Sequence, residues 1–187
     1  MTIKHFTIDQ QGWLVQARRV PSPNFNSRPA QTDVSLLVIH NISLPPGQFG
    51  GPHICDFFTN SLDTSCHPYF EEITGLKVSA HLLIDREGHL TQFVSFDDRA
   101  WHAGESCYEG RDNCNGYSIG IELEGADDIP YSDHQYEVLA AVTRSLSQQY
   151  PTITKQRIVG HSDIAPGRKT DPGPTFDWQR YFLLMGV

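Results

Sequence analysis

Residues 34–40 read "VSLLVIH", an apolar run that ends on a histidine. Continuous runs of Val, Leu and Ile of this length are typical of strands that are buried on both faces of a sheet. A second, shorter run, "RIVGH" at 157–161, also ends on a histidine. These two stretches predict strands at the centre of an α/β fold, and they place His40 and His161 at the carboxyl ends of those strands.

Further strands are expected between these two. "KVSAHLLI" (77–84) and "HLTQFVSF" (89–96) have the β-pattern of a hairpin around "DREG", in which Gly88 can adopt positive φ. "YSIGIELEG" (117–125) alternates apolar with polar residues, so that one side of the strand is apolar and the other carries two glutamates. The hairpin and the separated strands together predict a mixed sheet.

Helices are expected mainly in the last third of the chain. Ser132 begins the clearest helical pattern, and Gln135 completes a capping box three residues later. "FDWQRYFLLM" (176–185) predicts a final helix. We therefore expect a single α/β domain over residues 1–187, with its core at about 12–178, in which helices flank a mixed central sheet.

The composition is that of an ordinary globular chain with an excess of negative charge. Among 187 residues, 14 Lys and Arg stand against 22 Asp and Glu, so the net charge is −8. This balance disfavours binding to nucleic acids and anionic membranes through bulk charge. No apolar run approaches the ~20 residues that a membrane-spanning helix needs. We expect a monomer without nucleic-acid or membrane partners.

The amino-terminal residues and the cysteines bear on the cellular compartment. "MTIKHFTIDQQGW" (1–13) lacks the apolar core of a secretory signal peptide. The four cysteines include no C-x-x-C pair, and we expect them to be free thiols. Both observations predict a cytoplasmic protein.

A metal site is the main functional hypothesis from the residues. If their strands are neighbours, His40 and His161 lie at the same edge of the sheet, where α/β proteins bind ligands. His161 and Asp171 both lie in "VGHSDIAPGRKTDPGP" (159–174), a stretch too rich in Pro and Gly to form a regular helix. Two histidines and a carboxylate with an open fourth position are typical of catalytic zinc. The alternative for each histidine is a hydrogen-bonded polar group at a strand end.

Two further residues fit hydrolysis at such a metal. Glu122 lies on the polar side of its strand, where a carboxylate can move a proton between water and a leaving amine. Lys169 can place positive charge where an oxyanion develops. The alternatives are a solvated glutamate and a surface lysine, and we expect Glu124 to be solvated. His81 and His102 either face the site or form hydrogen bonds within the fold.

One motif suggests a competing hypothesis, that the protein is a serine hydrolase. "GYSIG" (116–120) matches the G-x-S-x-G nucleophile elbow around Ser118. That motif requires a strand before the serine and a helix after it. Here β-type residues follow, so we interpret the match as accidental.

Several motifs in order resemble one known family, the zinc-dependent N-acetylmuramyl-L-alanine amidases of the AmpD type. The resemblance extends from about Gly12 to Trp178. The motifs that carry it are "LLVIHNISLPPGQFGG", "VSAHLLIDREG", "RAWHAG", "SIGIELEG" and "GHSDIAPGRKTDPGP". It implies a peptidoglycan-recognition-like fold and hydrolysis of the amide bond between 1,6-anhydro-N-acetylmuramic acid and L-alanine during cytoplasmic peptidoglycan recycling.

The resemblance also implies roles for individual residues. One Zn²⁺ per chain would be held by His40, His161 and Asp171, with Glu122 as general base and Lys169 as the group that stabilises the transition state. In the phage-lysozyme branch of the family the third ligand is a cysteine. A catalytically inactive peptidoglycan-binding module remains the alternative.

A muropeptide carries carboxylates, so a chain of net charge −8 needs local cations to bind one. The candidates lie in or beside the loops named above, and they are Lys77, Arg99, Arg111, Arg168 and Lys169. Trp101 is a candidate for stacking on the sugar or lining the peptide groove, and Asn41 follows a proposed ligand directly in the sequence. The alternative for each is a solvated surface residue. We expect Asn41, Lys77, Trp101 and Arg168 to contact the substrate.

Overall fold

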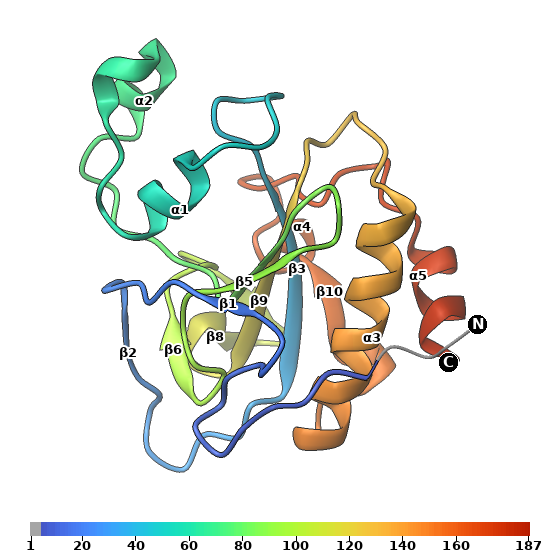
Figure 1. Ribbon diagram of the computed structural model, residues 1–187. Helices are drawn as coiled ribbons and strands as arrows, with labels where there is room; N and C mark the ends of the chain where they lie inside the picture. Colours follow the sequence, from blue (N-terminus) through green and yellow to red (C-terminus); the bar gives the residue numbers. More distant parts are fainter. Residues whose placement is uncertain (1–4) are drawn as a thin grey trace.

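A computed structural model describes residues 5–187 of the chain (Figure 1). Its centre is a six-stranded sheet that is mixed, as predicted. The β4–β5 pair is antiparallel, and every other neighbouring pair is parallel. In spatial order the strands are β1 (Arg18–Arg19), β5 (Leu90–Gln92), β4 (Leu82–Ile84), β9 (Ser118–Glu124), β3 (Leu36–Ile42) and β10 (Ile158–Gly160).

The predicted hairpin is present as β4 and β5. Leu83 pairs with Thr91 across it, and Gly88 in the connecting turn has a φ of +81°. This is a backbone conformation that L side chains rarely adopt. The hairpin continues the parallel part of the sheet through β4, which also pairs with β9.

Two helices cover one face of the sheet, as Figure 1 shows. They are α3 (Asp133–Gln149) and α5 (Trp178–Met185). The predicted capping box at the start of α3 is formed, because the Ser132 hydroxyl accepts from the Gln135 amide and the Gln135 side chain accepts in return. The core between sheet and helices is continuous and aliphatic, with aromatic residues beside α5.

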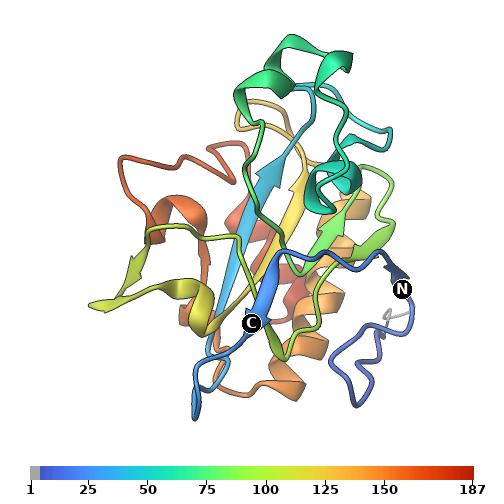
Figure 2. The same ribbon diagram turned by 90° about the vertical axis from the view of Figure 1, so that its left-hand side faces the viewer.

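The opposite face of the sheet is covered by shorter elements (Figure 2). β2 pairs with β6 and β7 with β8 in two small antiparallel sheets. The elements are α1 (His53–Phe58), α2 (Pro68–Glu72), α4 (His161–Ile164), β2 (Phe25–Ser27), β6 (Asp98–Ala100), β7 (Cys107–Tyr108) and β8 (Arg111–Asp112). Three-residue 3₁₀ turns occur at Thr64–Cys66, Cys114–Gly116 and Lys155–Arg157.

The register of the central strands brings distant residues to one edge of the sheet. β3 lies between β9 and β10 and is parallel to both, with Ile39 opposite Gly160 and His40 opposite Glu122. Side chains alternate along a strand, so partners in register share a face. Ile39 belongs to the core beneath α3, which places His40 and Glu122 on the opposite face.

No helix within residues 5–187 is long and apolar enough to cross a membrane. The four cysteines are all unpaired, as predicted from their spacing. Cys114 is buried, and its Sγ lies 3.2 Å from the hydroxyl of Tyr117. The fold is therefore held by its core and hydrogen bonds, without disulfide cross-links among the described residues.

Candidate metal centre and catalytic site

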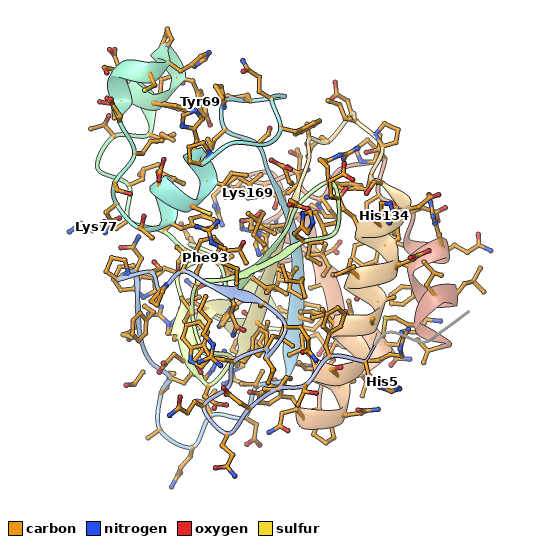
Figure 3. All side chains as sticks on the ribbon, viewed as in Figure 1. His5, Tyr69, Lys77, Phe93, His134 and Lys169 are labelled. Carbon is orange, nitrogen blue, oxygen red and sulfur yellow. The ribbon has the colours of Figure 1, made fainter. Side chains whose placement is uncertain are left out.

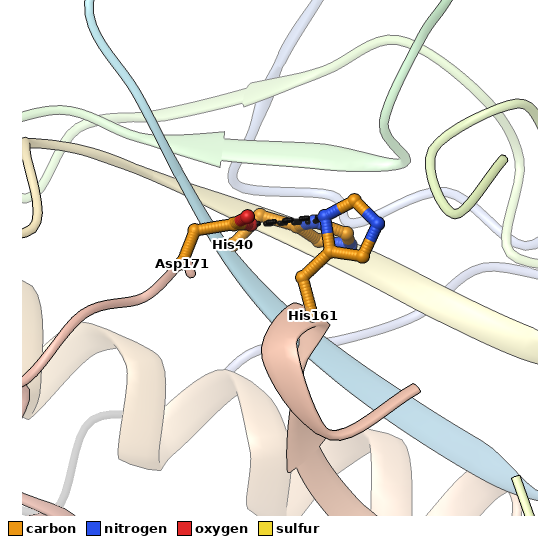
Figure 4. A group of neighbouring side chains, drawn as sticks. All are labelled: His40, His161 and Asp171. Atoms are coloured by element: carbon orange, nitrogen blue, oxygen red, sulfur yellow. Dashed lines mark hydrogen bonds and ion pairs between the residues drawn. The ribbon is translucent and has the colours of Figure 1, made fainter. Parts of the chain in front are cut away.

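Three proposed ligands meet at the carboxyl ends of β3 and β10, as Figure 4 shows. His40 Nδ1 lies 2.9 Å from His161 Nδ1, and Asp171 Oδ2 lies 3.1 Å from each of these nitrogens. His40 is the fifth residue of β3, whereas His161 is the first residue of α4, directly after β10. Parallel strand pairing thus brings together two histidines that are 121 positions apart in the sequence.

The "HSDIAPGRKTDPGP" segment is shaped by hydrogen bonds as well as by its prolines. Its first four residues form α4, a single helical turn that the Pro and Gly content had argued against. Beyond it, the Ser162 amide donates to the Asp171 carbonyl at 3.0 Å. The buried Tyr131 hydroxyl donates to the Pro172 carbonyl at 2.7 Å. These two bonds hold Asp171 beside His161.

The two histidines present the same ring nitrogen to the cluster. His161 Nε2 lies 3.1 Å from the Ala103 carbonyl, which can only accept, so this nitrogen carries the proton. His40 Nε2 lies 2.9 Å from His102 Nδ1. Both Nδ1 atoms are therefore directed toward Asp171 with Nε2 bonded elsewhere, which is the arrangement of two imidazole metal ligands.

Burial and hydrogen bonding set the charge states in the cluster. Burial lowers the pKa of His40 to about 4, against the effect of the neighbouring Asp171 carboxylate. Burial raises the pKa of Asp171, but the adjacent imidazoles of His161 and His40 outweigh it and hold this pKa below the usual range. An ionised carboxylate beside two imidazoles is the donor set that a divalent cation needs.

Glu122 lies next to His40 on the same face. Its side chain is 8% exposed, and its Oε2 is buried without a hydrogen-bond partner among residues 5–187. Burial raises the pKa of Glu122 well above its ordinary value, and the negative charge of Asp171 raises it further while Lys169 opposes the shift. A buried carboxyl oxygen without a partner is costly, which is typical of a group kept for chemistry.

Glu124 is a correction to the sequence analysis, which expected a solvated side chain. It is 4% exposed. Its Oε1 accepts from the Gly50 amide at 2.5 Å, and its Oε2 accepts from the Arg86 amide at 3.2 Å. The loops that carry these amides cover this end of the strand, so Glu124 binds backbone while Glu122 keeps a free oxygen.

A cleft of about 380 Å³ opens beside the cluster. Four of its lining residues are cationic and none is acidic, which gives it a positive charge within an acidic chain. His161 and Trp101 lie in its wall together with these cations, which are Lys77, Arg99, Arg168 and Lys169. Figure 3 shows Lys77 on the side of the molecule away from His134 of α3.

The four residues expected to contact a substrate differ in the hydrogen bonds that they already form within the protein. Trp101 lines the cleft and donates from Nε1 to Asn26 Oδ1 at 2.7 Å, and the exposed Lys77 lines the same cleft. Arg168 also lines it, but its guanidinium donates to the Ala103 and Glu105 carbonyls. Asn41 donates to the Asp127 carboxylate at 2.8 Å.

His81 and His102 both form hydrogen bonds within the fold, and neither belongs to the three-ligand cluster. His81 Nδ1 accepts from the Gly120 amide at 3.0 Å, and His102 lies between His40 and Ser118. Ser118 is fully buried at the start of β9 and is followed by six further strand residues. The helix that a nucleophile elbow requires is absent there, as predicted.

A known family model matches the part of the chain that contains this site. The family model described as N-acetylmuramoyl-L-alanine amidase, Amidase_2, matches residues 30–174. This span contains all three residues of the metal cluster as well as Glu122 and Lys169.

Individual relatives are similar over almost the full chain. The 1,6-anhydro-N-acetylmuramyl-L-alanine amidase AmpD of Escherichia coli K12 is 60% identical over 176 residues, covering 94% of this chain and 96% of that protein. A crystal structure of a selenomethionine derivative of AmpD superposes with a TM-score of 0.92 at 57% identity, covering 95% and 99%. Pseudomonas aeruginosa AmpDh3 in complex with anhydromuramic pentapeptide gives 0.61 at 28% identity, covering 97% and 66%.

Proposed function

Since this chain belongs to the N-acetylmuramoyl-L-alanine amidase family, we propose that it is a zinc-dependent amidase of cytoplasmic peptidoglycan recycling. Its reaction is hydrolysis of the amide bond between 1,6-anhydro-N-acetylmuramic acid and L-alanine in muropeptides. Identities of 55–60% to AmpD proteins support the anhydro form of the substrate. The recycling role and the location come from the family resemblance, and cell fractionation tests the location.

The observation that carries the proposal is the donor triangle of His40, His161 and Asp171. Its edges of 2.9, 3.1 and 3.1 Å are close to the separation of about 3.3 Å that tetrahedral zinc with bonds of 2.0–2.1 Å imposes on its ligand atoms. Two imidazole nitrogens and one carboxylate oxygen match a catalytic zinc site with a fourth position left for water. The residues therefore fit one zinc ion per chain.

Zinc, when bound, supplies a Lewis acid that polarises the scissile carbonyl and acidifies water. The chain itself supplies the movement of the proton. Among residues 5–187, Glu122 Oε2 has no hydrogen-bond partner, so it is free to take a proton from the attacking water and to deliver it to the amine of L-alanine. The raised pKa of Glu122 favours its holding that proton between the two transfers.

The cationic cleft supports the choice of substrate. Muropeptides are anionic, and Lys77, Arg168 and Lys169 lie in the wall beside His161. We assign Lys169 to the oxyanion because its side chain is exposed and its positive charge acts on the neighbouring Glu122. Trp101 would stack against the sugar, and Asn41 and Arg168 would contact substrate only through atoms not already bound within the protein.

A peptidoglycan-binding module without activity is the second candidate. Such a module needs the cleft but not three converging donors with an unpaired carboxyl oxygen beside them. The intact cluster therefore favours catalysis. We further propose that the protein acts as a monomer, which its mass in size-exclusion chromatography with light scattering tests.

Zinc content and product analysis test the proposed function together. Purified protein should contain one zinc per chain by elemental analysis, and a His161→Ala variant should contain far less. Mass spectrometry after incubation with an anhydro-muropeptide should show the free peptide and the free anhydro-sugar. Zinc-loaded wild-type protein that leaves the amide intact would support the binding module instead.

A further inference from the structure

We propose that Ser118 and His102 set the tautomer of His40, so that its Nδ1 is held ready for a metal ion. The proposal goes beyond the assignment of ligands, and it rests on the metal centre proposed above. It concerns a hydrogen-bond chain that runs from the Cys114 carbonyl through Ser118 and His102 to His40.

The donor and acceptor roles along this hydrogen-bond chain can be assigned from its buried end. Ser118 Oγ lies 2.7 Å from the Cys114 carbonyl, which can only accept, so the single hydroxyl proton points there. The same Oγ lies 3.1 Å from His102 Nε2 and must accept from it. His102 Nε2 therefore carries a proton, and in the neutral ring Nδ1 is an acceptor.

The contact between His102 and His40 continues the hydrogen-bond chain in the same direction. His102 Nδ1 lies 2.9 Å from His40 Nε2, so an acceptor there places the His40 proton on Nε2. The lone pair of His40 is then on Nδ1, the atom that points at His161 and Asp171. Reversing the chain would put a proton on His40 Nδ1, which would block the bond to a metal.

The neighbouring residues Asn115 and Gly120 fix the position of His102. Asn115 Oδ1 accepts from the amides of His102 and Ala103 at 3.0 and 2.8 Å. The same Ala103 carbonyl fixes the tautomer of His161, so one asparagine positions the partners of both ligands. A Cβ added at Gly120 would lie 2.4 Å from the His102 ring, which therefore fits only against a glycine.

His102 is a positioning residue in this proposal. Two substitutions separate the effect of its hydrogen-bond acceptor from that of the imidazole ring itself. His102→Leu removes the acceptor for His40, and zinc affinity should fall by about 10–100-fold. His102→Asn can keep an acceptor oxygen near the place of Nδ1 and should recover most of that affinity. Ser118→Ala should weaken zinc binding in the same range, because His102 is then free to adopt the other tautomer.

Ser145→Ala is the matched control for the serine variant. Ser145 is also a buried serine that donates to a backbone carbonyl, 2.8 Å away at Phe6, but it lies on α3 across the sheet. Zinc dissociation constants come from competition with a chromogenic chelator, and circular dichroism checks that each variant is folded. The proposal would be overturned if the wild-type protein binds zinc and the His102→Leu variant binds it with the same affinity.

Nitrogen-15 NMR of the metal-free wild-type protein tests the same point without any variant. Long-range proton–nitrogen correlations should report His40 protonated at Nε2 and His102 protonated at Nε2. A proton on Nδ1 of His102 would overturn the proposal whether or not the protein binds zinc. Failure of the proposed function would appear differently, as folded wild-type protein that takes up no zinc.

Discussion

Replacing Glu122 by glutamine should stabilise the metal-free protein at neutral pH and also slow turnover. The side chain keeps its size but loses its ionisation. In the unfolded chain this carboxyl has a pKa near 4.5, whereas in the fold burial and the charge of Asp171 raise the pKa well above that value. The folded protein therefore favours the protonated form, and it loses stability when pH rises above the unfolded pKa.

The size of the stability difference between wild type and Glu122→Gln follows from proton linkage. Below the unfolded pKa of 4.5 the carboxyl is neutral in both states, and wild type and Glu122→Gln should be equally stable. Above it, wild type should lose about 1.4 kcal/mol relative to the variant for each pH unit. The difference levels off where pH passes the pKa of Glu122 in the folded protein.

Urea denaturation with a chelator present, at steps between about pH 4 and pH 8, measures this difference. Glu72→Gln is the control, because it makes the same substitution at an exposed position of α2. On the zinc-loaded protein, Glu122→Gln should lower kcat/KM on an anhydro-muropeptide by about 10²–10⁴-fold. A stability difference that does not change with pH would refute the raised pKa.

Three further outcomes are expected. Glu124→Ala should retain zinc but lower the free energy of unfolding by about 2–4 kcal/mol, because two backbone amides lose a charged acceptor; unchanged stability would contradict this. Gly120→Ala should cost about 1–3 kcal/mol by calorimetry, since its Cβ meets the His102 ring, whereas Gly116→Ala, with its nearest contact at 3.5 Å, should be tolerated. All four cysteines should react with a thiol reagent in urea without reductant, and fewer than four would contradict their assignment as free thiols.

The convergence of His40, His161 and Asp171 could be predicted because it follows from strand pairing. A strand buried on both faces needs a continuous apolar run, and both runs end on a histidine. Parallel neighbours have their carboxyl ends at one edge, so His40 and His161 meet once β3 and β10 pair. The sequence could not predict that pairing with certainty, because β10 has only three residues.

The environment of Glu124 could not be predicted for a physical reason. Alternation along β9 shows which side of the strand a residue is on, but not whether other segments cover that side. Here the covering amides come from Gly50 and Arg86, far away in the sequence. The same holds for Arg168, whose carbonyl partners lie in a loop more than 60 residues before it.

The position of β10 at the edge of the sheet would link the proposed metal binding to local unfolding. Two of the three donors, on His161 and Asp171, follow this edge strand, whereas His40 lies on its inner neighbour. Local opening of β10 and the loop that follows it would separate these donors while β3 stays paired with β9. An ion bound at the proposed site would oppose that opening, and the added stability would grow with the logarithm of the ratio of ion concentration to dissociation constant. Removal of the ion should therefore speed amide hydrogen exchange in β10 and the loop that follows it.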